Sequence, residues 1–410
     1  MLEYKTLARI FHADQSGNDV GNHEALAWQR LEADSSFRTG IVTSLGELFV
    51  AMPRFLSLRM EELLCAERQV AHLWEAMPVQ VQEHYVVQAI SEELLTSNQM
   101  EGVRSTRAET DAAVRAAAKE SGSARGVRFG EFAKLYINLT HRKAAPPQSL
   151  EDIRRVYDAV VLGEVAEEDW PDGELFRAHD VDVHGPHGVL HQGVSGELRI
   201  GSMLTKMMDL LNDSQIPKLP AAIMGHFLFE YAHPFYDGNG RTGRYLLALS
   251  LADSLTLPTV LSLSRIIGEH KNAYYKAFVE AEDKLNCGEL TFFVAAVLDF
   301  IAQGQAELIE LFEVQAGQQT KAQGLCRELV QEADLPKPAA SLLETLMIEH
   351  LCGIRQGMTL DEASEQLDLG KQSARAYLGQ LEGAGLAQYV GRRPLRLAVS
   401  EEIAGQLRRE

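Results

Sequence analysis

Apolar residues recur at steps of three and four positions along almost the whole chain, and few segments alternate with a period of two. Residues at these steps share one face of an α-helix, which can pack against a core. The sequence therefore predicts a mainly α protein. We expect a series of helices across residues 22–104, including the segments SLGELFVAMPRFLSLRMEELL and EHYVVQAISEELLTSNQME.

Residues 179–193, HDVDVHGPHGVLHQG, interrupt the helical pattern. Apolar and polar residues alternate in part of this segment, and a Gly-Pro pair stands near its centre. Alternation around a turn is typical of two antiparallel strands, so we expect a short β-hairpin. The four histidines of the segment match no tetrahedral ligand spacing, which favours the hairpin over a metal site.

The last part of the chain follows a different pattern. The segment QEADLPKPAAS is typical of a boundary between domains. Beyond it, TLDEASEQLDLGKQSARAYLGQLEGAGLAQYVGRRPLRLAV reads as helix, glycine turn, helix and two short strands, which predicts a winged helix-turn-helix. We divide the 410 residues into an N-terminal helical region (1–110), a core domain (111–310) and a winged helix-turn-helix domain (311–410).

The segment HPFYDGNGRTGR, residues 233–244, concentrates the polar chemistry of the chain. It follows one predicted helix, LPAAIMGHFLFEYA, and precedes another, RYLLALSLADSL, so it forms a helix-loop-helix junction. Glycines at the start of a helix let backbone N–H groups converge on an anion, and the helix dipole adds to the attraction. Arg241 and Arg244 are three positions apart, so both can reach oxyanions of one polyphosphate.

Two further residues complete the pattern expected of a nucleotide site. Asp237 is a hard oxygen ligand of the kind that holds Mg²⁺ against phosphates. His233 carries the one kind of side chain that ordinarily titrates near neutral pH, which suits a general base. A turn, a helix cap or a surface ion pair would explain each residue alone, but their combination in one short segment favours transfer chemistry on a nucleotide.

HPFYDGNGRTGR resembles the signature of the Fic family, His-Pro-Phe-x-(Asp or Glu)-Gly-Asn-Gly-Arg-x-x-Arg, and matches every specified position. The resemblance covers roughly residues 90–300, and the N-terminal helices and the C-terminal domain are similar to those of longer bacterial members. It implies a Fic-type helical core with the hairpin as a flap. It also implies adenylyl transfer, in which AMP passes from ATP to a Tyr, Ser or Thr hydroxyl of a target protein and pyrophosphate leaves.

The resemblance also implies roles for single residues of the motif. His233 would deprotonate the incoming hydroxyl, and Asp237 would hold Mg²⁺ for the ATP substrate. Five residues would contact the phosphates: Gly238, Asn239 and Gly240 at the α-phosphate, and Arg241 and Arg244 at the β- and γ-phosphates. We expect Phe235 to anchor the loop in the apolar core.

A second short pattern, SNQMEG, lies N-terminal to this core. On its residues alone, Glu101 is a solvated carboxylate before a glycine that caps a helix. The pattern also resembles the inhibitory sequence Ser/Thr-x-x-x-Glu-Gly/Asn of the Fic subgroup whose inhibitory helix precedes the core, with Ser97, Glu101 and Gly102 at the specified positions. The resemblance implies that Glu101 pairs with Arg244 and withholds it from the γ-phosphate.

The resemblance implies two further contacts. The flap would align the target by strand-like pairing. Its candidate contact residues are Val189, Leu190 and His191. The segment KNAYYKAFVEAED is similar to the stretch that borders the adenine, so Tyr274 and Tyr275 either stack on the base or pack in the core. Some relatives carry an asparagine where this chain has Glu282, which leaves the choice of nucleotide open.

The formal net charge of −19 argues against nonspecific binding to nucleic acid or to an anionic membrane. The predicted winged helix nevertheless carries a sparse set of basic and polar residues that could face DNA phosphates. They are Lys371, Gln372, Arg375, Arg392, Arg393 and Arg396. DNA is therefore a candidate partner, beside a protein-docking or structural role for this domain.

The cysteines and the apolar segments bear on the compartment. The four cysteines are far apart and form no CxxC pair, which suits reduced thiols. The N-terminus lacks the basic start and apolar run of a signal peptide, and the most apolar stretch, LTFFVAAVLDFIA, is short and contains Asp299. We therefore expect a cytoplasmic protein without a membrane segment.

The leading hypothesis is an autoinhibited, Mg²⁺-dependent protein adenylyltransferase. Its target is an unidentified protein or the chain itself, and a homo-oligomer is compatible with the sequence. Within the same enzyme class, the site could instead remove AMP or use another nucleotide. From a different class, a DNA-binding regulator could sense nucleotide through a Fic core. His233 favours the enzyme, because a sensor needs no base.

Overall fold

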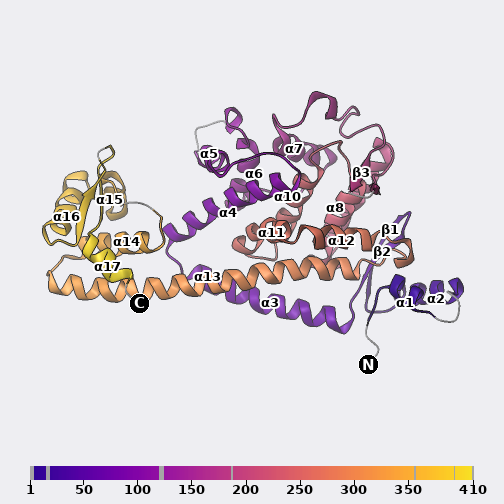
Figure 1. Cartoon of the computed structure of the whole chain (residues 1–410), viewed down its shortest axis with the longest axis horizontal. Helices are drawn as coiled ribbons and strands as arrows, with labels where there is room; N and C mark the ends of the chain where they lie inside the picture. Colours follow the sequence, from indigo (N-terminus) through magenta and orange to yellow (C-terminus); the bar gives the residue numbers. More distant parts are fainter. Residues whose placement is uncertain are drawn as a thin grey trace. The chain divides into compact units, whose positions relative to one another are not determined.

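The computed structural model of the chain describes residues 4–14, 19–119, 124–185, 188–354, 357–391 and 393–408 (Figure 1). The chain folds into two compact units, one of Met1–Gln69 with Val86–Glu307 and one of Val70–Tyr85 with Leu308–Glu410. Three helices contribute residues to both units: α3 (Arg54–Glu75), α4 (Val79–Met100) and α13 (Thr291–Glu332). The predicted mainly α fold is confirmed, whereas the division into three domains stays a prediction.

The first unit is mostly helical, with two hairpins. Its other elements are α1 (Leu7–Ala13), α2 (Val20–Leu31), β1 (Ser36–Thr43), β2 (Gly46–Ala51), α5 (Arg107–Ala117), α6 (Gly130–Thr140), α7 (Leu150–Val161), β3 (Asp182–Gly185), β4 (Gly188–Gln192), α8 (Glu197–Asn212), α9 (Lys218–Ala232), α10 (Asn239–Leu251), α11 (Leu257–Glu269) and α12 (Lys271–Ala281), with short 3₁₀ turns at Ala124–Gly126, Glu167–Asp169 and Lys284–Asn286.

Helix α9 lies at the centre of this unit. Every residue after Lys218 is buried except Glu230, and the helix packs against α8 and α10. A helix that is apolar on all sides belongs in a core rather than at a surface. Helix α7 packs against α10, and it begins with a capping box in which the Ser149 side chain and the Asp152 side chain bond each other's backbone N–H groups. The loop between α9 and α10 therefore starts and ends on rigid elements.

The prediction of helices throughout residues 22–104 is wrong at β1 and β2, which form an antiparallel hairpin. At Gly46 the φ angle is +117°, and a Cβ there would lie 2.9 Å from the carbonyl oxygen of Cys287. Both faces of β2 are covered, so Leu48 and its neighbours through Ala51 are all buried. A strand buried on both faces is a continuous apolar run, which periodicity alone does not separate from a helix. Helix α3 begins only after Pro53.

The predicted hairpin within residues 179–193 is confirmed. Strand β3 pairs with β4 in antiparallel register, with Val183 opposite His191 and an irregularity between Val183 and His184. The turn residues Pro186 and His187 lie outside the described residues, as do the side chains of Val189 and Leu190. The backbone of the expected flap is therefore in place, and His191 is the candidate contact residue with a described side chain.

The second unit has its own apolar core, separate from that of the first. Its remaining elements are α14 (Lys337–Leu351), α15 (Leu360–Leu367), α16 (Lys371–Gly383), β5 (Ala387–Val390), β6 (Arg396–Val399) and α17 (Glu401–Arg408). Strands β5 and β6 pair in antiparallel register. This order of helix, helix and two strands follows the expected one, but its assignment as a winged helix-turn-helix stays a prediction. Arg392 lies outside the described residues.

Within the described residues, α13 is the one helix that is long and apolar enough to cross a membrane. It has 42 residues and a most apolar window with a mean hydropathy of 1.5, but 56% of that window is buried inside the protein. A core helix of a folded protein passes the same test. Its apolar residues Phe293, Val294 and Leu298 indeed belong to the core of the first unit.

Candidate active site

The loop between α9 and α10 is anchored by one aromatic side chain. Phe235 is fully buried, and its ring stacks on that of Tyr157 from α7, with a centroid distance of 3.6 Å and an interplanar angle of 12°. Phe176, from the segment between α7 and β3, contacts the ring of Phe235 as well, with a centroid distance of 5.6 Å. The expected anchoring role of Phe235 is confirmed. The motif therefore has a fixed position relative to α7.

Asn239, the first residue of α10, braces the loop from inside. Its Nδ2 donates to the Phe235 carbonyl at 2.8 Å, and its Oδ1 accepts from the Phe235 N–H at 3.0 Å. Both polar ends of the amide are therefore used within the loop. Any contribution of residues 238–240 to an anion site must come mainly from backbone N–H groups at the start of α10.

Gly238 makes the entry into α10 possible. Its φ is +84°, and a Cβ would lie 2.5 Å from Cγ1 of Val161. A side chain at this position would therefore suffer both backbone strain and a clash with α7. The close approach explains why the loop requires glycine here.

Arg241 is a fully buried cation without a hydrogen-bond partner among the described residues. Its Nε, Nη1 and Nη2 atoms are all inaccessible and unsatisfied, and its nearest carboxylate oxygen is Oδ2 of Asp237 at 3.6 Å. Burial leaves this charge poorly solvated and lowers the pKa of Arg241 from its usual value. A buried guanidinium in this state has the donors and the charge to bind an anion.

Asp237 lies at the open side of the loop. Its side chain is 42% exposed, and its Oδ1 accepts from the Gly238 N–H at 2.6 Å. No group of three or more histidine, cysteine, aspartate or glutamate side chains is placed to hold a metal anywhere in the described ranges. A single half-exposed carboxylate fits Mg²⁺ that is shared with phosphates, because Mg²⁺ takes one or two carboxylates and keeps several waters.

His233 terminates α9 in a left-handed conformation, with φ 47° and ψ 61°. Burial lowers the pKa of His233 to about 4, and the neighbouring charges of His191 and Arg177 act in the same direction. A hydrogen bond to the backbone of Glu230 opposes this effect. The imidazole is therefore neutral at physiological pH and can accept a proton.

An ion pair joins Glu101, just after the end of α4, to Arg244 of α10. Oε1 of Glu101 lies 2.9 Å from Nη2 of Arg244, whose side chain is 2% exposed. Arg244 also donates from Nε to Oγ of Ser97 at 3.1 Å and from Nη2 to the Ser97 carbonyl at 3.0 Å. Nε and Nη2 of Arg244 are therefore both engaged by Ser97 and Glu101. Burial lowers the pKa of Arg244, but the combined effect of Glu101, Tyr274, Glu230 and Tyr275 outweighs it and raises that pKa above its usual value.

Two glycines permit this contact. A Cβ at Gly240 would lie 2.2 Å from Oε1 of Glu101 and 2.9 Å from Nη1 of Arg244, so any side chain there would separate the pair. Gly102 has a φ of +73° and terminates α4, as expected of a glycine that caps a helix. Gly102 thus caps the helix as expected, whereas the Glu101 carboxylate is not a freely solvated one but contacts Arg244.

Sequence reasoning missed Glu230, one turn before His233. Its Oε1 is inaccessible and has no hydrogen-bond partner in the described part of the chain. Burial raises the pKa of Glu230 to about 8; Arg244 opposes this, and Glu101 adds to it. The available signal was a lone acid in an otherwise apolar helix, although it does not reveal the proximity of Arg244.

The two candidate adenine residues have different surroundings. Tyr274 is buried, and its hydroxyl lies 2.6 Å from Nε2 of His226 inside the core. Tyr275 is half-buried, and the ammonium of Lys271 lies 5.5 Å from the centre of its ring. Tyr274 therefore packs in the core and does not stack on a base. Tyr275 keeps part of its surface exposed.

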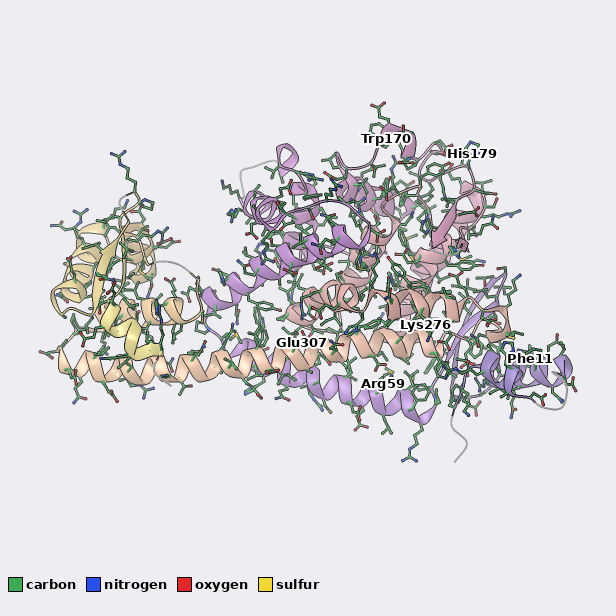
Figure 2. All side chains as sticks on the ribbon, viewed as in Figure 1. Phe11, Arg59, Trp170, His179, Lys276 and Glu307 are labelled. Carbon is green, nitrogen blue, oxygen red and sulfur yellow. The ribbon has the colours of Figure 1, made fainter. Side chains whose placement is uncertain are left out.

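The two hairpin histidines with described side chains, His179 and His191, have different surroundings. His179 is at the outer surface, with 83% of its side chain exposed (Figure 2), whereas the His191 side chain is 11% exposed. Nδ1 of His191 lies 2.7 Å from Oε2 of Glu282, and Nε2 lies 2.9 Å from the Tyr231 carbonyl. His191 therefore connects the flap to the ends of α9 and α12. Its ring centre is 6.3 Å from that of His233.

Known proteins are similar to parts of this chain. Residues 147–251 match the family model described as Fic/DOC family. A protein of Aquifex aeolicus named as a probable protein adenylyltransferase is 36% identical over 74 residues, 18% of this chain and 21% of that protein. Protein adenylyltransferase Fic of Aedes aegypti is 29% identical over 174 residues, which are 41% of this chain and 31% of the length of that protein. The crystal structure of a Fic family protein from Desulfovibrio desulfuricans G20 aligns with a TM-score of 0.49 at 16% identity, over 83% of this chain and 96% of that chain.

The chain spans 21% and 31% of the length of these two curated relatives. The matched residues 147–251 run from the start of α7 to the end of α10 and contain the whole HPFYDGNGRTGR motif. The anchored loop, the glycine-dependent start of α10 and the unsatisfied arginine lie within the same range. Residues 147–251 are therefore a Fic domain.

Proposed function

We propose that this chain is a protein adenylyltransferase that Glu101 restrains. The unsatisfied, fully buried guanidinium of Arg241 carries the proposal, because it needs an anion and lies at the start of α10. A triphosphate supplies that anion. His233, neutral and at the other end of the same loop, supplies a base.

The proposed reaction transfers AMP to a hydroxyl of a target protein. The hydroxyl oxygen attacks the α-phosphorus, His233 takes its proton, and the bond between the α-phosphorus and the pyrophosphate oxygen breaks. Backbone N–H groups at residues 238–240 would face the α-phosphate, and Arg241 would balance the charge that develops on the leaving pyrophosphate. Most of the catalysis would therefore be positioning and charge stabilisation by the loop.

Two groups depend on the bound nucleotide. A pKa of about 4 makes His233 a weak base in the free protein, but the negative charge of a triphosphate would raise it toward neutrality, where base catalysis is most effective. Asp237 would hold Mg²⁺ beside the phosphates, and the ion would supply charge neutralisation there.

We propose that the contact between Glu101 and Arg244 is inhibitory. Arg244 lies three residues beyond Arg241 on α10, so its guanidinium can serve the far end of the same triphosphate. While Glu101 and Ser97 occupy its donors, Arg244 is withheld from that phosphate. Displacement of the end of α4 would free Arg244 to bind that phosphate.

The proposed target is a Tyr, Ser or Thr hydroxyl of another protein, with the chain itself as a second substrate. The flap supports a protein target, because the backbone of β4 can pair with an extended segment next to His233. We propose the cytoplasm as the compartment, since all four cysteines are free thiols.

Two of the basic residues that could face DNA have acidic neighbours, which argues against DNA binding as a second function. Nζ of Lys371 lies 2.6 Å from Oδ1 of Asp361, and Nη1 of Arg396 lies 3.2 Å from Oε2 of Glu362. A DNA phosphate would have to displace these carboxylates and would then lie next to them. Exposed cations with acidic neighbours attract phosphate weakly.

One experiment distinguishes the proposed reaction from its alternatives. Cell lysate is incubated with the protein, Mg²⁺ and ATP labelled at either the α- or the γ-phosphate. We expect protein-bound label from the α-labelled ATP alone, with release of pyrophosphate. Label from γ-labelled ATP would indicate phosphorylation, and release of AMP from pre-labelled protein would indicate AMP removal. No labelled protein with either the wild type or Glu101→Gly would overturn transfer.

A further inference from the structure

Arg177 is a fully buried arginine that makes all its described hydrogen bonds with backbone carbonyl groups. Its Nε donates to the His233 carbonyl at 2.8 Å, and its Nη1 donates to the His179 carbonyl at 2.6 Å. Its Nη2 donates to the carbonyls of Val194 at 2.8 Å and Ala232 at 3.3 Å. Among the described residues, no carboxylate lies within ion-pair distance of its guanidinium. Burial of a charge without an ion-pair partner costs free energy, so a specific role for Arg177 is expected.

The four carbonyl groups belong to three separate parts of the chain. Those of Ala232 and His233 end α9, that of His179 precedes β3, and that of Val194 follows β4. Arg177 therefore connects both ends of the flap to the backbone of His233. The planar guanidinium can bond several oxygens at once in fixed directions, which a lysine ammonium cannot.

Gly193 shows how closely these parts approach one another. A Cβ at this position would lie 2.4 Å from Nη2 of Arg177 and 3.1 Å from Cβ of His233. The backbone that follows β4 thus passes close to the guanidinium of Arg177 and to Cβ of His233. The N–H of Val194 also donates to the Ala232 carbonyl at 3.1 Å, so the same contact continues in the backbone.

His233 needs such support. A residue other than glycine adopts the left-handed conformation only where its surroundings enforce it, and His233 has a φ of 47°. Its N–H bonds the Phe229 carbonyl, and its own carbonyl is the one that Arg177 binds. The conformation of His233 is therefore fixed on both sides, and one of the two bonds comes from Arg177.

We propose that Arg177 is a positioning residue that fixes the backbone of His233 and both ends of the flap as one unit, so that base and target segment keep a constant separation. This inference rests on the proposed role of His233 as the base. It adds that the reach of the base depends on a side chain outside the HPFYDGNGRTGR motif.

The charge of Arg177 gives the proposal a second readout. The charged and titratable side chains that act on His233 are His191 from the flap, Arg177 and Glu101 from the end of α4. Burial contributes most to the low pKa of His233, and Arg177 contributes further. Asp172, Asp180 and Tyr236 act on Arg177 itself. Removal of the Arg177 charge should therefore raise the pKa of His233.

The test compares Arg177→Met and Arg177→Lys in the Glu101→Gly background, with Arg199→Met, an exposed arginine of α8, as the matched control. The measurements are kcat and KM for ATP between about pH 4 and pH 9, and the NMR titration of the His233 imidazole. Thermal melts determine the folded fraction used to normalise each rate.

We expect Arg177→Met to lower kcat by about 10- to 100-fold, because a misplacement of about 1 Å costs that much, while KM for ATP changes little. The acidic limb of its pH–kcat profile and the pKa of the His233 imidazole should both shift toward neutral pH. Arg177→Lys keeps the charge but loses the array of bonds, so kcat should fall without the pH shift. The control should match the parent.

Three results would overturn the inference. The first is an unchanged kcat in Arg177→Lys. The second is a fall in the rate of the Arg177 variants that is no larger than the fall in their folded fraction. The third is a rise in KM for ATP with no change in kcat. Should Arg177→Met fail to fold, Arg177→Lys and its imidazole titration still decide the matter. Activity that survives His233→Ala would instead refute the proposed function itself, whatever the Arg177 variants do.

Discussion

Replacement of Glu101 by glycine should release the proposed inhibition. The carboxylate lies 2.9 Å from Nη2 of Arg244, in a pair whose arginine side chain is 2% exposed and whose glutamate side chain is 22% exposed. A charge-assisted hydrogen bond of this kind contributes about 1.5–3 kcal/mol. Its removal should raise the rate of self-labelling by about 10- to 150-fold at subsaturating ATP, since about 1.4 kcal/mol corresponds to tenfold.

The two bonds from Arg244 to Ser97 limit the effect. They remain in the Glu101→Gly variant and still hold part of the guanidinium toward α4. Glu101→Gln removes the charge but keeps the size of the side chain, so it should give an intermediate rate. An increase beyond the upper value would need a second cause, such as a nucleotide that the intact contact holds in a poor position.

The assay is the initial rate of protein labelling from α-phosphate-labelled ATP under identical ATP and Mg²⁺. Gln99→Gly is the matched control, because it introduces the same backbone freedom at an exposed position of the last turn of α4. We expect this control to behave as the wild type. Equal labelling by Glu101→Gly and wild type, or an equal increase in Gln99→Gly, would refute the reasoning.

Three further predictions concern stability. Because burial raises the pKa of Glu230 to about 8 from its ordinary 4.5, its contribution is full below pH 4.5 and is lost as the pH rises through 8. The unfolding free energy of wild type relative to Glu230→Gln should therefore fall by up to about 5 kcal/mol over that window, measured by urea denaturation. Phe235→Ala should cost about 3–5 kcal/mol, read from the same denaturation, since it removes the ring stacked on Tyr157. Gly238→Ala should cost at least about 1–2 kcal/mol and lower the melting temperature, because of its φ of +84° and the clash with Val161.

Local patterns were sufficient for two elements whose signals are local. The hairpin strands within residues 179–193 and the junction between helices at His233 each follow from residues a few positions apart. In these segments the propensity, the caps and the apolar spacing agree with one another, which is when sequence reasoning works.

Features that depend on distant segments could not be predicted in this way. Strand β2 contacts the backbone of residues 288–290, so its burial on both faces is a property of the fold. Arg177 acts on carbonyl groups as far away as His233, and nothing in its neighbourhood marks it. The side chain of Asn239 is used inside the loop, although its place in the motif suggested a phosphate contact.

The proposed enzyme depends most directly on His233, and a single comparison tests it. Glu101→Gly, Glu101→Gly with His233→Ala, and Glu101→Gly with His141→Ala are incubated with α-phosphate-labelled ATP and Mg²⁺, and covalent label is counted per folded protein. His141 is the matched control because it is exposed, follows α6 and lies outside the loop. We predict label in the first and third proteins and none in the second. Label of equal intensity in the second would contradict the account.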